Sequence, residues 1–355
     1  MPLPGLCNGR SVSDDFRVTY PKIELHVHLE GTVQPATLLE IARRNGVSLP
    51  ASSEQELRAL YRFKDFAHFI EVWLLVTSAL RTADDFRRVL VEYAAEASAQ
   101  GAVYVEGIFS PTQQFRRGIP YEVVFEGYCD GVEEARELYG VQVRLTPDLT
   151  RGGSPEESEH TVRHAARFRE RGVVAVGLGG LEREFPAELY ADAFRLALAE
   201  GLGSVPHAGE VVGPESIRSA LDDLGAHRLR HGIRAIEDEG ILRELADRGI
   251  VLDTCLVGNV CTGVVPAVEL HPLPHLVRGG VVCSLSTDDP AMFDTSLERE
   301  YDLAASLGLE PRGFYEAGVA GALCDDETRA GLRRIGEDYD WNSIAGPPLA
   351  AEPAA

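Results

Sequence analysis

Eight short apolar runs, rich in β-branched residues, recur along the chain and are separated by longer amphipathic stretches. In the separator 82–101, apolar residues fall three and four positions apart, Thr82 with Asp85 resembles a capping box, and Gly101 supplies a stop signal. Because strands that alternate with helices favour a parallel sheet, this order favours an α/β fold of the (β/α)8 type, a TIM barrel, over an open doubly wound sheet. The predicted strands span residues 22–29, 102–109, 141–147, 173–179, 202–209, 228–233, 250–254 and 281–287.

The segment 33–81, which follows the first predicted strand, is too long for one connecting helix. Its part 65–76, DFAHFIEVWLLV, is rich in large apolar side chains. We therefore expect a helical cap inserted after strand one, over the mouth of the barrel. The expected layout is an N-terminal tail over 1–18, a single barrel domain over 19–340, and a disordered tail over 341–355.

The composition restricts the partners and the location of the chain. Its formal net charge of −22 at pH 7 would repel phosphate backbones, so nucleic acid is not an expected partner. No apolar run reaches the roughly 18 residues of a membrane span, and the first residues lack the layout of a signal peptide. Six scattered cysteines without a CxxC pair favour a reducing, cytoplasmic setting. The oligomeric state stays open, and a homodimer is one option.

Two histidines stand one residue apart in the first predicted strand, KIELHVHL. Ile23, Leu25 and Val27 alternate with more polar residues, which is the period of a strand. His26 and His28 therefore project to the same face, where two neutral imidazoles can bind one metal ion. The alternative is a pair of half-buried histidines bonded to the backbone, because so short a motif is weak by itself.

Further ligand-type side chains stand near the carboxyl ends of three other predicted strands, which is where barrel active sites lie. Taken singly, each has a plain structural explanation, such as a core histidine or a turn. Together, three histidines and an aspartate form a nitrogen and oxygen ligand set that suits zinc. The segment HAGE supplies His207 and Glu210, RHG supplies His231, and STDDP supplies Asp288 and Asp289.

Four blocks, PKIELHVHLEGT, HAGE, RHGIRA and STDDPAMF, resemble those of the adenosine deaminase family in the amidohydrolase superfamily, over about residues 20 to 335. The resemblance implies a (β/α)8 barrel with one catalytic zinc ion per chain. It also implies that Glu210 protonates the purine ring and that the backbone of Gly180 contacts the purine. His231 and Asp289 match the pair that orients and deprotonates the attacking water. The implied metal ligands are His26, His28, His207 and Asp288.

The chemistry implied by these residues is hydrolytic deamination of a 6-aminopurine with release of ammonia. Zinc lowers the pKa of a water molecule from about 15.7 to near 7, so hydroxide becomes available at neutral pH to attack C6. The adjacent ring nitrogen must then gain a proton. Glu210 can supply that proton only if its pKa is raised, for example by burial.

The substrate is indicated less directly than the reaction. Glu30 stands where adenosine deaminases usually carry an aspartate that bonds the ribose 5′-hydroxyl, and its extra methylene would crowd that group. Two branches fit better: adenine deaminases, and aminodeoxyfutalosine deaminases of menaquinone synthesis, whose substrate has a carboxyphenyl tail. Thr150 and Arg151 follow the third predicted strand, where the arginine either pairs with that carboxylate or is a solvated loop residue. Phe66 and Trp73 are candidates to cover the substrate.

The sequence thus predicts a zinc-dependent aminodeoxyfutalosine deaminase, with adenosine and adenine as alternative substrates. A second hypothesis is a purine-binding homologue without catalysis, although the ligand set is intact. A third is a lactonase or phosphotriesterase of the same superfamily, which the lack of a lysine in the fourth predicted strand disfavours. One departure from the family pattern affects the loop after strand seven, where Leu256 and Gly258 replace the usual proline and serine.

Overall fold

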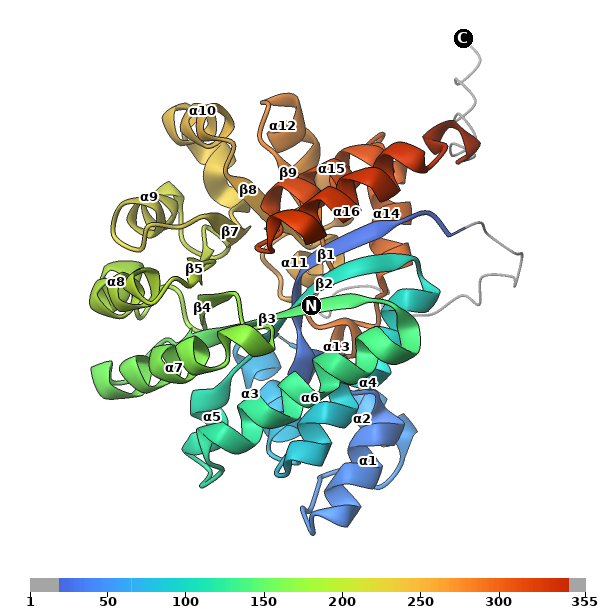
Figure 1. Ribbon diagram of the computed structural model, residues 1–355, viewed down its shortest axis with the longest axis vertical. Coiled ribbons are helices and arrows are strands. Elements are labelled where there is room, and N and C mark those ends of the chain that lie inside the picture. The colour runs from blue at the N-terminus through green and yellow to red at the C-terminus, as the bar shows by residue number, and fades with distance from the viewer. Residues whose placement is uncertain (1–18, 65, 345–355) are drawn as a thin grey trace.

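A ring of parallel strands forms the framework of the chain in the computed structural model, which describes residues 19–64 and 66–344 (Figure 1). The strands of these residues are β1 (Lys22–His28), β2 (Ala102–Phe109), β3 (Gln142–Thr150), β4 (Ala175–Gly179), β5 (Gly203–Ser204), β6 (His207–Ala208), β7 (Arg228–His231), β8 (Val251–Thr254) and β9 (Cys283–Leu285). They pair in the orders β1-β2-β3-β4-β5 and β6-β7-β8-β9. β5 and β6 are two parts of one strand position, because Val205 bonds to β4 and Pro206 accepts from Arg230 of β7.

The ring closes where β1 meets the segment that follows β9. His28 N donates to Asp288 O at 2.7 Å, and Asp288 N donates to His26 O at 3.1 Å. Val27 and Asp288 form a parallel bridge, and the Ser286 hydroxyl accepts from the backbone N–H of His26 at 3.2 Å. The predicted (β/α)8 barrel is therefore confirmed, with each predicted strand present and its bounds unchanged or shifted by a few residues.

Helices surround the strands and cover their outward apolar side chains (Figure 1). The predicted start of the helix after the cap is confirmed, because Thr82 and Asp85 form a reciprocal capping box. The helices of the outer layer are α4 (Ala83–Ala99), α6 (Tyr121–Tyr139), α7 (Pro155–Arg167), α8 (Ala191–Ala199), α9 (Pro214–Asp222), α10 (Glu239–Arg248), α12 (Leu273–Arg278) and α15 (Pro311–Gly321).

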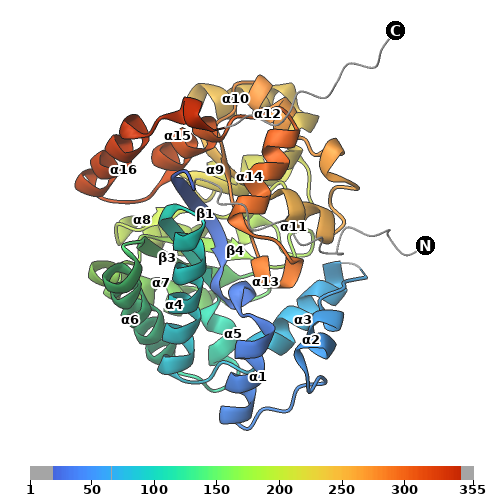
Figure 2. The same cartoon turned by 90° about the vertical axis from the view of Figure 1, so that its right-hand side faces the viewer.

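A helical insertion after β1 matches the predicted cap. It consists of α1 (Pro35–Arg44), α2 (Glu54–Leu60) and α3 (Phe66–Thr77), and Figure 2 shows it near α13 (Pro290–Phe293). Phe69 of α3 packs against Phe293, with ring centroids 5.1 Å apart. The cap therefore contacts the segment that directly follows Asp289. The remaining helices of the described chain are α5 (Pro111–Phe115), α11 (Leu256–Cys261), α14 (Leu297–Ser306) and α16 (Asp326–Asp338).

The barrel domain extends slightly past its predicted end. Trp341–Ser343 form a 3₁₀ turn, Trp341 Nε1 donates to Gly336 O at 2.8 Å, and the indole packs against Tyr315. The predicted tail is therefore wrong for residues 341–344, because this indole has both an apolar neighbour and a hydrogen-bond acceptor. Residues 1–18 and 345–355 lie outside the described residues. None of the helices in the described ranges has the length and apolarity that a bilayer span requires.

Buried ion pairs link different strands inside the barrel. Arg228 of β7 donates to Glu106 of β2 and to Asp253 of β8, each at 2.6 Å, and to Gly321 O at 2.7 Å. Its side chain and both carboxylates are almost completely buried. Because such charges are very costly without partners, this network requires that β2, β7 and β8 come together.

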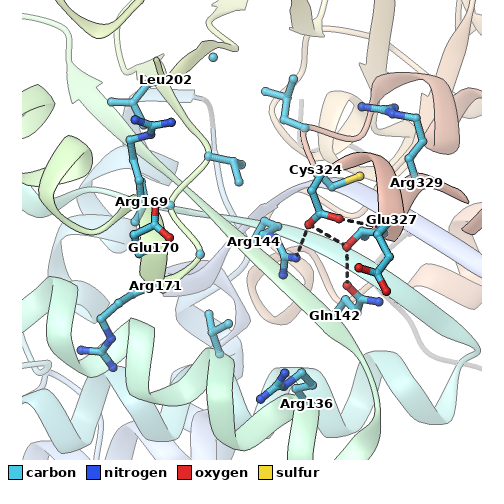
Figure 3. Close-up of a pocket in the computed structure, with 18 of the residues that line it drawn as sticks. Arg136, Gln142, Arg144, Arg169, Glu170, Arg171, Leu202, Cys324, Glu327 and Arg329 are labelled. Atoms are coloured by element: carbon cyan, nitrogen blue, oxygen red, sulfur yellow. Dashed lines mark hydrogen bonds and ion pairs between the residues drawn. The ribbon is translucent and has the colours of Figure 1, made fainter. Parts of the chain in front are cut away.

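The amino-terminal ends of β3, β4 and β5 border a cavity of about 1290 Å³, which Figure 3 shows. Arginines are prominent in its wall, including Arg136, Arg144, Arg169 and Arg329. Arg144 forms an ion pair with Asp325 at 3.6 Å. None of the predicted site residues lines this cavity, so the candidate active site lies elsewhere, at the carboxyl ends of the strands.

Removing the buried arginine should destabilise the fold strongly. We expect Arg228→Met to lower the free energy of unfolding by about 3–5 kcal/mol, because two buried carboxylates lose their cation. Urea denaturation measures this change. As a control, Arg195→Met removes an exposed ion pair with Asp192 and should cost less than about 1 kcal/mol. Equal losses in the two variants would contradict the role assigned to Arg228.

Candidate active site

The four predicted metal ligands converge at the carboxyl end of the barrel. His28 Nε2 lies 3.2 Å from His207 Nε2, and Asp288 Oδ1 lies 3.4 Å from His26 Nε2 and 3.5 Å from His28 Nε2. His26 and His28 project from β1, His207 from β6, and Asp288 from the turn after β9. The same-face geometry predicted for the two histidines of β1 is confirmed.

These four donors fit a divalent metal ion. Tetrahedral coordination with bonds of about 2.0–2.1 Å places neighbouring ligand atoms about 3.3–3.4 Å apart, close to the observed separations. His26 Nε2 is buried and has no hydrogen-bond partner among the described residues. His28 and His207 direct ring nitrogens at each other, an arrangement that a shared cation would stabilise. The donor set is therefore suited to a metal, independently of any sequence pattern.

Burial keeps the imidazoles in the neutral form that binds metals. It lowers the pKa of His26 and of His207 well below the usual value, and that of His28 to about 3. The nearby Arg230 guanidinium acts in the same direction on the pKa of each of these histidines. Asp288 partly opposes the shift at His28. The site is thus ready to bind a cation without first releasing protons.

Residues beneath the cluster orient the histidine rings. His207 Nδ1 bonds to Leu178 O at 3.0 Å and lies 3.5 Å from Asp148 Oδ2. Asp148 in turn accepts a hydrogen bond from Arg230. Because Nδ1 is engaged by a carbonyl acceptor, it carries the ring proton, and Nε2 of His207 is left for the metal. The sequence did not single out Asp148 or Arg230, although Arg230 lies in a predicted strand and Asp148 directly follows one.

Two of the predicted site residues have strained backbones. His231 has φ of 61° and Asp288 has φ of 67°, in the left-handed region that side chains with a Cβ rarely adopt. Such strain persists only where surrounding contacts enforce it, and it is concentrated at functional sites. The turn at each strand end therefore holds these side chains in positions that a relaxed strand would not give.

A buried carboxylate fixes the turn that carries Glu210. Glu182 accepts hydrogen bonds from the backbone N–H of Gly209, Val211 and Val212, at 2.6–2.9 Å, and from the Ser216 hydroxyl at 2.5 Å. Burial, with Asp288 and Glu182 nearby, raises the pKa of Glu210 well above its usual value. A protonated Glu210 is what the predicted acid requires. The sequence analysis did not single out Glu182, which stands two residues after Gly180.

His231 lies beside Glu210 and the proposed metal ligand Asp288. His231 Nε2 is 3.6 Å from Glu210 Oε2 and 4.0 Å from Asp288 Oδ2. Its Nδ1 contacts the Asn259 side chain at 3.2 Å. The resemblance pairs His231 with Asp289, yet Nδ1 of His231 meets the side-chain amide of Asn259 of α11 and not a carboxylate.

Asp289 lies against Gly31, where a Cβ would come within 2.0 Å of its Oδ1. That Oδ1 is buried without a hydrogen-bond partner among the described residues. Glycine at position 31 is therefore what allows the carboxylate to pack beside the turn after β1. Its Oδ1 therefore remains available to a bound water or substrate.

Gly180 and Glu30, two of the predicted substrate contacts, lie just past the carboxyl ends of β4 and β1. Gly180 follows β4 with φ of 111°, a conformation that suits glycine. Glu30 follows β1 and is fully buried. Its Oε1 accepts from Ser110 N at 2.8 Å, whereas its Oε2 has no partner within the described chain. Burial raises the pKa of Glu30 to about 7. One oxygen of Glu30 is thus left for a ligand.

Arg151 is buried and tied to the backbone. Its Nη2 donates to His207 O at 2.8 Å and its Nη1 to Phe185 O, which leaves Nε without a partner in the described part of the chain. Thr150 ends β3, half-buried, and Phe66 begins α3, half-buried against Phe69. A bidentate carboxylate clamp would need the existing bonds of Arg151 to break. Substrate contacts by these three residues stay predictions.

Comparisons with known proteins identify the family to which this site belongs. The adenosine deaminase family profile matches residues 21–335. The chain belongs to the adenosine deaminase family. A curated relative, the aminodeoxyfutalosine deaminase of Acidothermus cellulolyticus, is 50% identical over 328 residues, which cover 90% of this chain and 92% of the relative.

Two solved structures extend the comparison with the adenosine deaminase family. An adenine deaminase from Arthrobacter aurescens is similar with a TM-score of 0.86 at 27% identity, covering 90% of this chain and 98% of its own. An amidohydrolase from Burkholderia ambifaria with bound Zn has a TM-score of 0.84 at 26% identity, covering 92% of each chain. The histidine and aspartate cluster of this chain agrees with the metal dependence of amidohydrolase deaminases.

The departure from the adenosine deaminase family pattern after β8 has a local explanation. Leu256 N donates to Glu300 Oε2 at 2.8 Å, a bond that the usual proline could not make. Glu300 is buried and also accepts from the Thr295 hydroxyl at 2.9 Å. At position 258, a Cβ would lie 2.8 Å from Asp288 Oδ2, so Gly258 leaves room for that carboxylate. These contacts hold the loop beside the proposed metal ligands in this chain.

Metal binding should be measurable without any substrate. We expect chelator-treated protein to melt at a higher temperature after Zn²⁺ is added, by an amount equivalent to about 4 kcal/mol at 1,000 times the dissociation constant. His28→Gln should lose most of this increase, because it removes one of four donors. The control is His275→Gln, an exposed histidine on α12. If Zn²⁺ leaves the melting temperature of the parent protein unchanged, the proposed metal site is contradicted.

Proposed function

We propose that this chain is a zinc-dependent hydrolytic deaminase that converts aminodeoxyfutalosine, a 6-aminopurine nucleoside, to its 6-oxo form with release of ammonia. The observation that carries the proposal is the convergence of three imidazoles and one carboxylate beside a buried Glu210. The 50% identity to an aminodeoxyfutalosine deaminase supports the choice of substrate. A small-molecule purine is therefore the proposed partner, with no nucleic acid involved.

His26, His28, His207 and Asp288 would hold one zinc ion per chain. Three nitrogens and one oxygen form a set that zinc commonly accepts, and the Zn-bound structural neighbour supports this metal. When bound, the ion would lower the pKa of a water molecule toward neutrality and so supply hydroxide for attack on C6.

Glu210 would protonate the ring nitrogen adjacent to C6. Its carboxyl is buried, its pKa is raised, and Glu182 fixes the turn on which it stands. Protonation at that nitrogen allows the ring to accept electrons as the oxygen adds at C6. Ammonia then leaves as the 6-oxo product forms.

His231 and Asp289 would position the attacking water from two sides. His231 Nε2 faces the space between Glu210 and Asp288. Asp289 presents a buried, unpartnered Oδ1. Gly180 would contact the purine through its backbone, and Glu30 would bind the sugar side of the substrate through its free Oε2. Phe66, Thr150 and Arg151, the last through Nε, complete the proposed substrate contacts.

Adenine is the second candidate substrate. The similarity to the adenine deaminase from Arthrobacter aurescens supports it, as does the glutamate at position 30. Adenine has no ribose, so a longer acidic side chain would meet no 5′-hydroxyl. The two candidates differ in whether the site must accommodate a 5′ substituent.

Replacing the proposed acid tests the mechanism. We expect Glu210→Gln to lower kcat by about 10²–10⁴-fold, because an amide cannot deliver the proton, while zinc content stays at that of the parent protein. The ultraviolet absorbance change from 6-amino to 6-oxo purine measures the rate. Glu215→Gln, an exposed acid at the start of α9, is the matched control. A fully active Glu210→Gln would remove Glu210 from this role.

A substrate panel tests the choice of nucleoside. We expect kcat/KM for aminodeoxyfutalosine to exceed the values for adenine, adenosine and 5′-modified adenosines by at least about tenfold, or 1.4 kcal/mol. Ammonia release from zinc-loaded protein provides the measurement. A preference for adenine would select the second candidate. No turnover of any of the four would refute the deaminase assignment.

A further inference from the structure

A chain of three hydrogen bonds runs from α12 to the active site. Leu273 N donates to His271 Nδ1 at 3.1 Å, His271 Nε2 contacts Asn259 Oδ1 at 3.1 Å, and Asn259 Nδ2 contacts His231 Nδ1 at 3.2 Å. His271, Asn259 and His231 are all buried. Water is therefore excluded as a ready alternative partner for these side chains.

The donor and the acceptor of every hydrogen bond in this series follow from the bond made by Leu273 N. A backbone N–H can only donate, so Nδ1 of His271 must accept and its ring proton must be on Nε2. That Nε2–H needs an acceptor, so the Asn259 amide must present its oxygen to His271. The amide then presents N–H to His231, whose Nδ1 can only accept. The opposite orientation of the Asn259 amide would point its NH₂ group at the Nε2–H of His271, so that two donors would face each other.

Burial of His271 supports the same conclusion. Burial lowers the pKa of His271 to about 4, so the ring is neutral near pH 7. A cationic His271 would also carry a proton on Nδ1, directed at the Leu273 N–H. The neutral tautomer of His271 is therefore fixed by geometry and by solvation together.

We propose that His271, acting through Asn259, holds His231 in the neutral tautomer with its proton on Nε2, so that His231 faces the reaction centre as a hydrogen-bond donor. This inference deepens the proposed function, because it rests on His231 facing the attacking oxygen. Nε2 lies 3.6 Å from Glu210 and 4.0 Å from Asp288, at the edge of the space where that oxygen must add.

The consequence is a division of labour within the site. A histidine whose Nδ1 accepts from an amide cannot take a proton on Nε2 without first losing one there. His231 therefore stabilises negative charge on the adding oxygen by donation, and it does not act as the base. Asn259 and His271 touch no reacting atom and serve as positioning residues.

The tautomer can be observed directly. In metal-loaded protein labelled with ¹⁵N at histidine, long-range ¹H–¹⁵N correlation spectra distinguish a protonated from an unprotonated ring nitrogen, and His231→Gln assigns the signals. We expect Nδ1 of His231 to be unprotonated and Nε2 to be protonated near pH 7. A proton on Nδ1 in the parent protein would overturn the proposal, and this measurement needs no variant that alters the chain of bonds.

Asn259→Asp should reverse the tautomer. A carboxylate accepts from both neighbours, so it would draw the His231 proton to Nδ1. We expect kcat to fall by about 10²-fold or more, with KM changed by less than about threefold and metal content kept. Unchanged His231 signals in a folded Asn259→Asp variant would overturn the proposal.

His271→Leu provides a second variant, because it removes the outer anchor and lets the amide rotate. We expect mixed His231 tautomers and a smaller loss of kcat than in Asn259→Asp. The matched control is His275→Leu, which alters an exposed histidine of α12, four residues further along the chain, and should leave the His231 signals unchanged. Tautomer signals of a single species in His271→Leu would assign the anchor to Asn259 alone and overturn the role of His271.

The spectra test the tautomer of His231 and the kinetics test the proposed function, so either claim can be refuted without the other. The expected tautomer in a protein that turns over no purine would refute the proposed function and keep the chain of bonds. Full deaminase activity with a proton on Nδ1 of His231 would do the reverse.

Discussion

The hydrogen bonds between β1 and the turn after β9 are the constraint on which the site depends. They join His28 N to Asp288 O and Asp288 N to His26 O, and so bring the first and last strand positions together. The same residues whose backbones close the ring supply three of the four proposed metal ligands. A shift of β1 relative to the turn after β9 would therefore both open the barrel and separate the proposed metal ligands.

The sequence predicted those parts of the structure that depend on local periodicity and on strand ends. The alternation around His26 marks a strand, and the HAGE, RHG and STDDP segments each stand at the end of a predicted strand. Parallel strands in a barrel end at the same rim, so the side chains at these ends were expected to meet. The positions of Glu182, Asn259 and His271 could not be obtained in this way. Each has a partner 12 or more residues away, on another element, and each looks like an ordinary polar residue of a loop or helix.

Arg151 shows what sequence spacing leaves out. Its position after β3 was compatible with a carboxylate partner or with a solvated loop side chain, whereas the structure buries it and two of its nitrogens donate to backbone carbonyls. Sequence spacing reports which rim a residue reaches, but not whether its hydrogen-bonding capacity is already used. The exchange of proline for Leu256 is similar, because its compensating partner Glu300 lies 44 residues away on α14. In both cases long-range packing decides the role of the residue.

The buried ion pairs inside the barrel have a consequence for how the chain can be divided. β2 and β3 supply the carboxylates Glu106 and Asp148, whereas β7 supplies the cations Arg228 and Arg230. The amino-terminal half of the barrel thus carries two interior carboxylates whose cations stand on β7, and the carboxyl-terminal half supplies one carboxylate, Asp253, to its two buried arginines. Neither half can bury all of its interior charges without the other, so the two halves are not independent folding modules. The carboxylates of β2 and β3 can lose their water only after β7 has been synthesised.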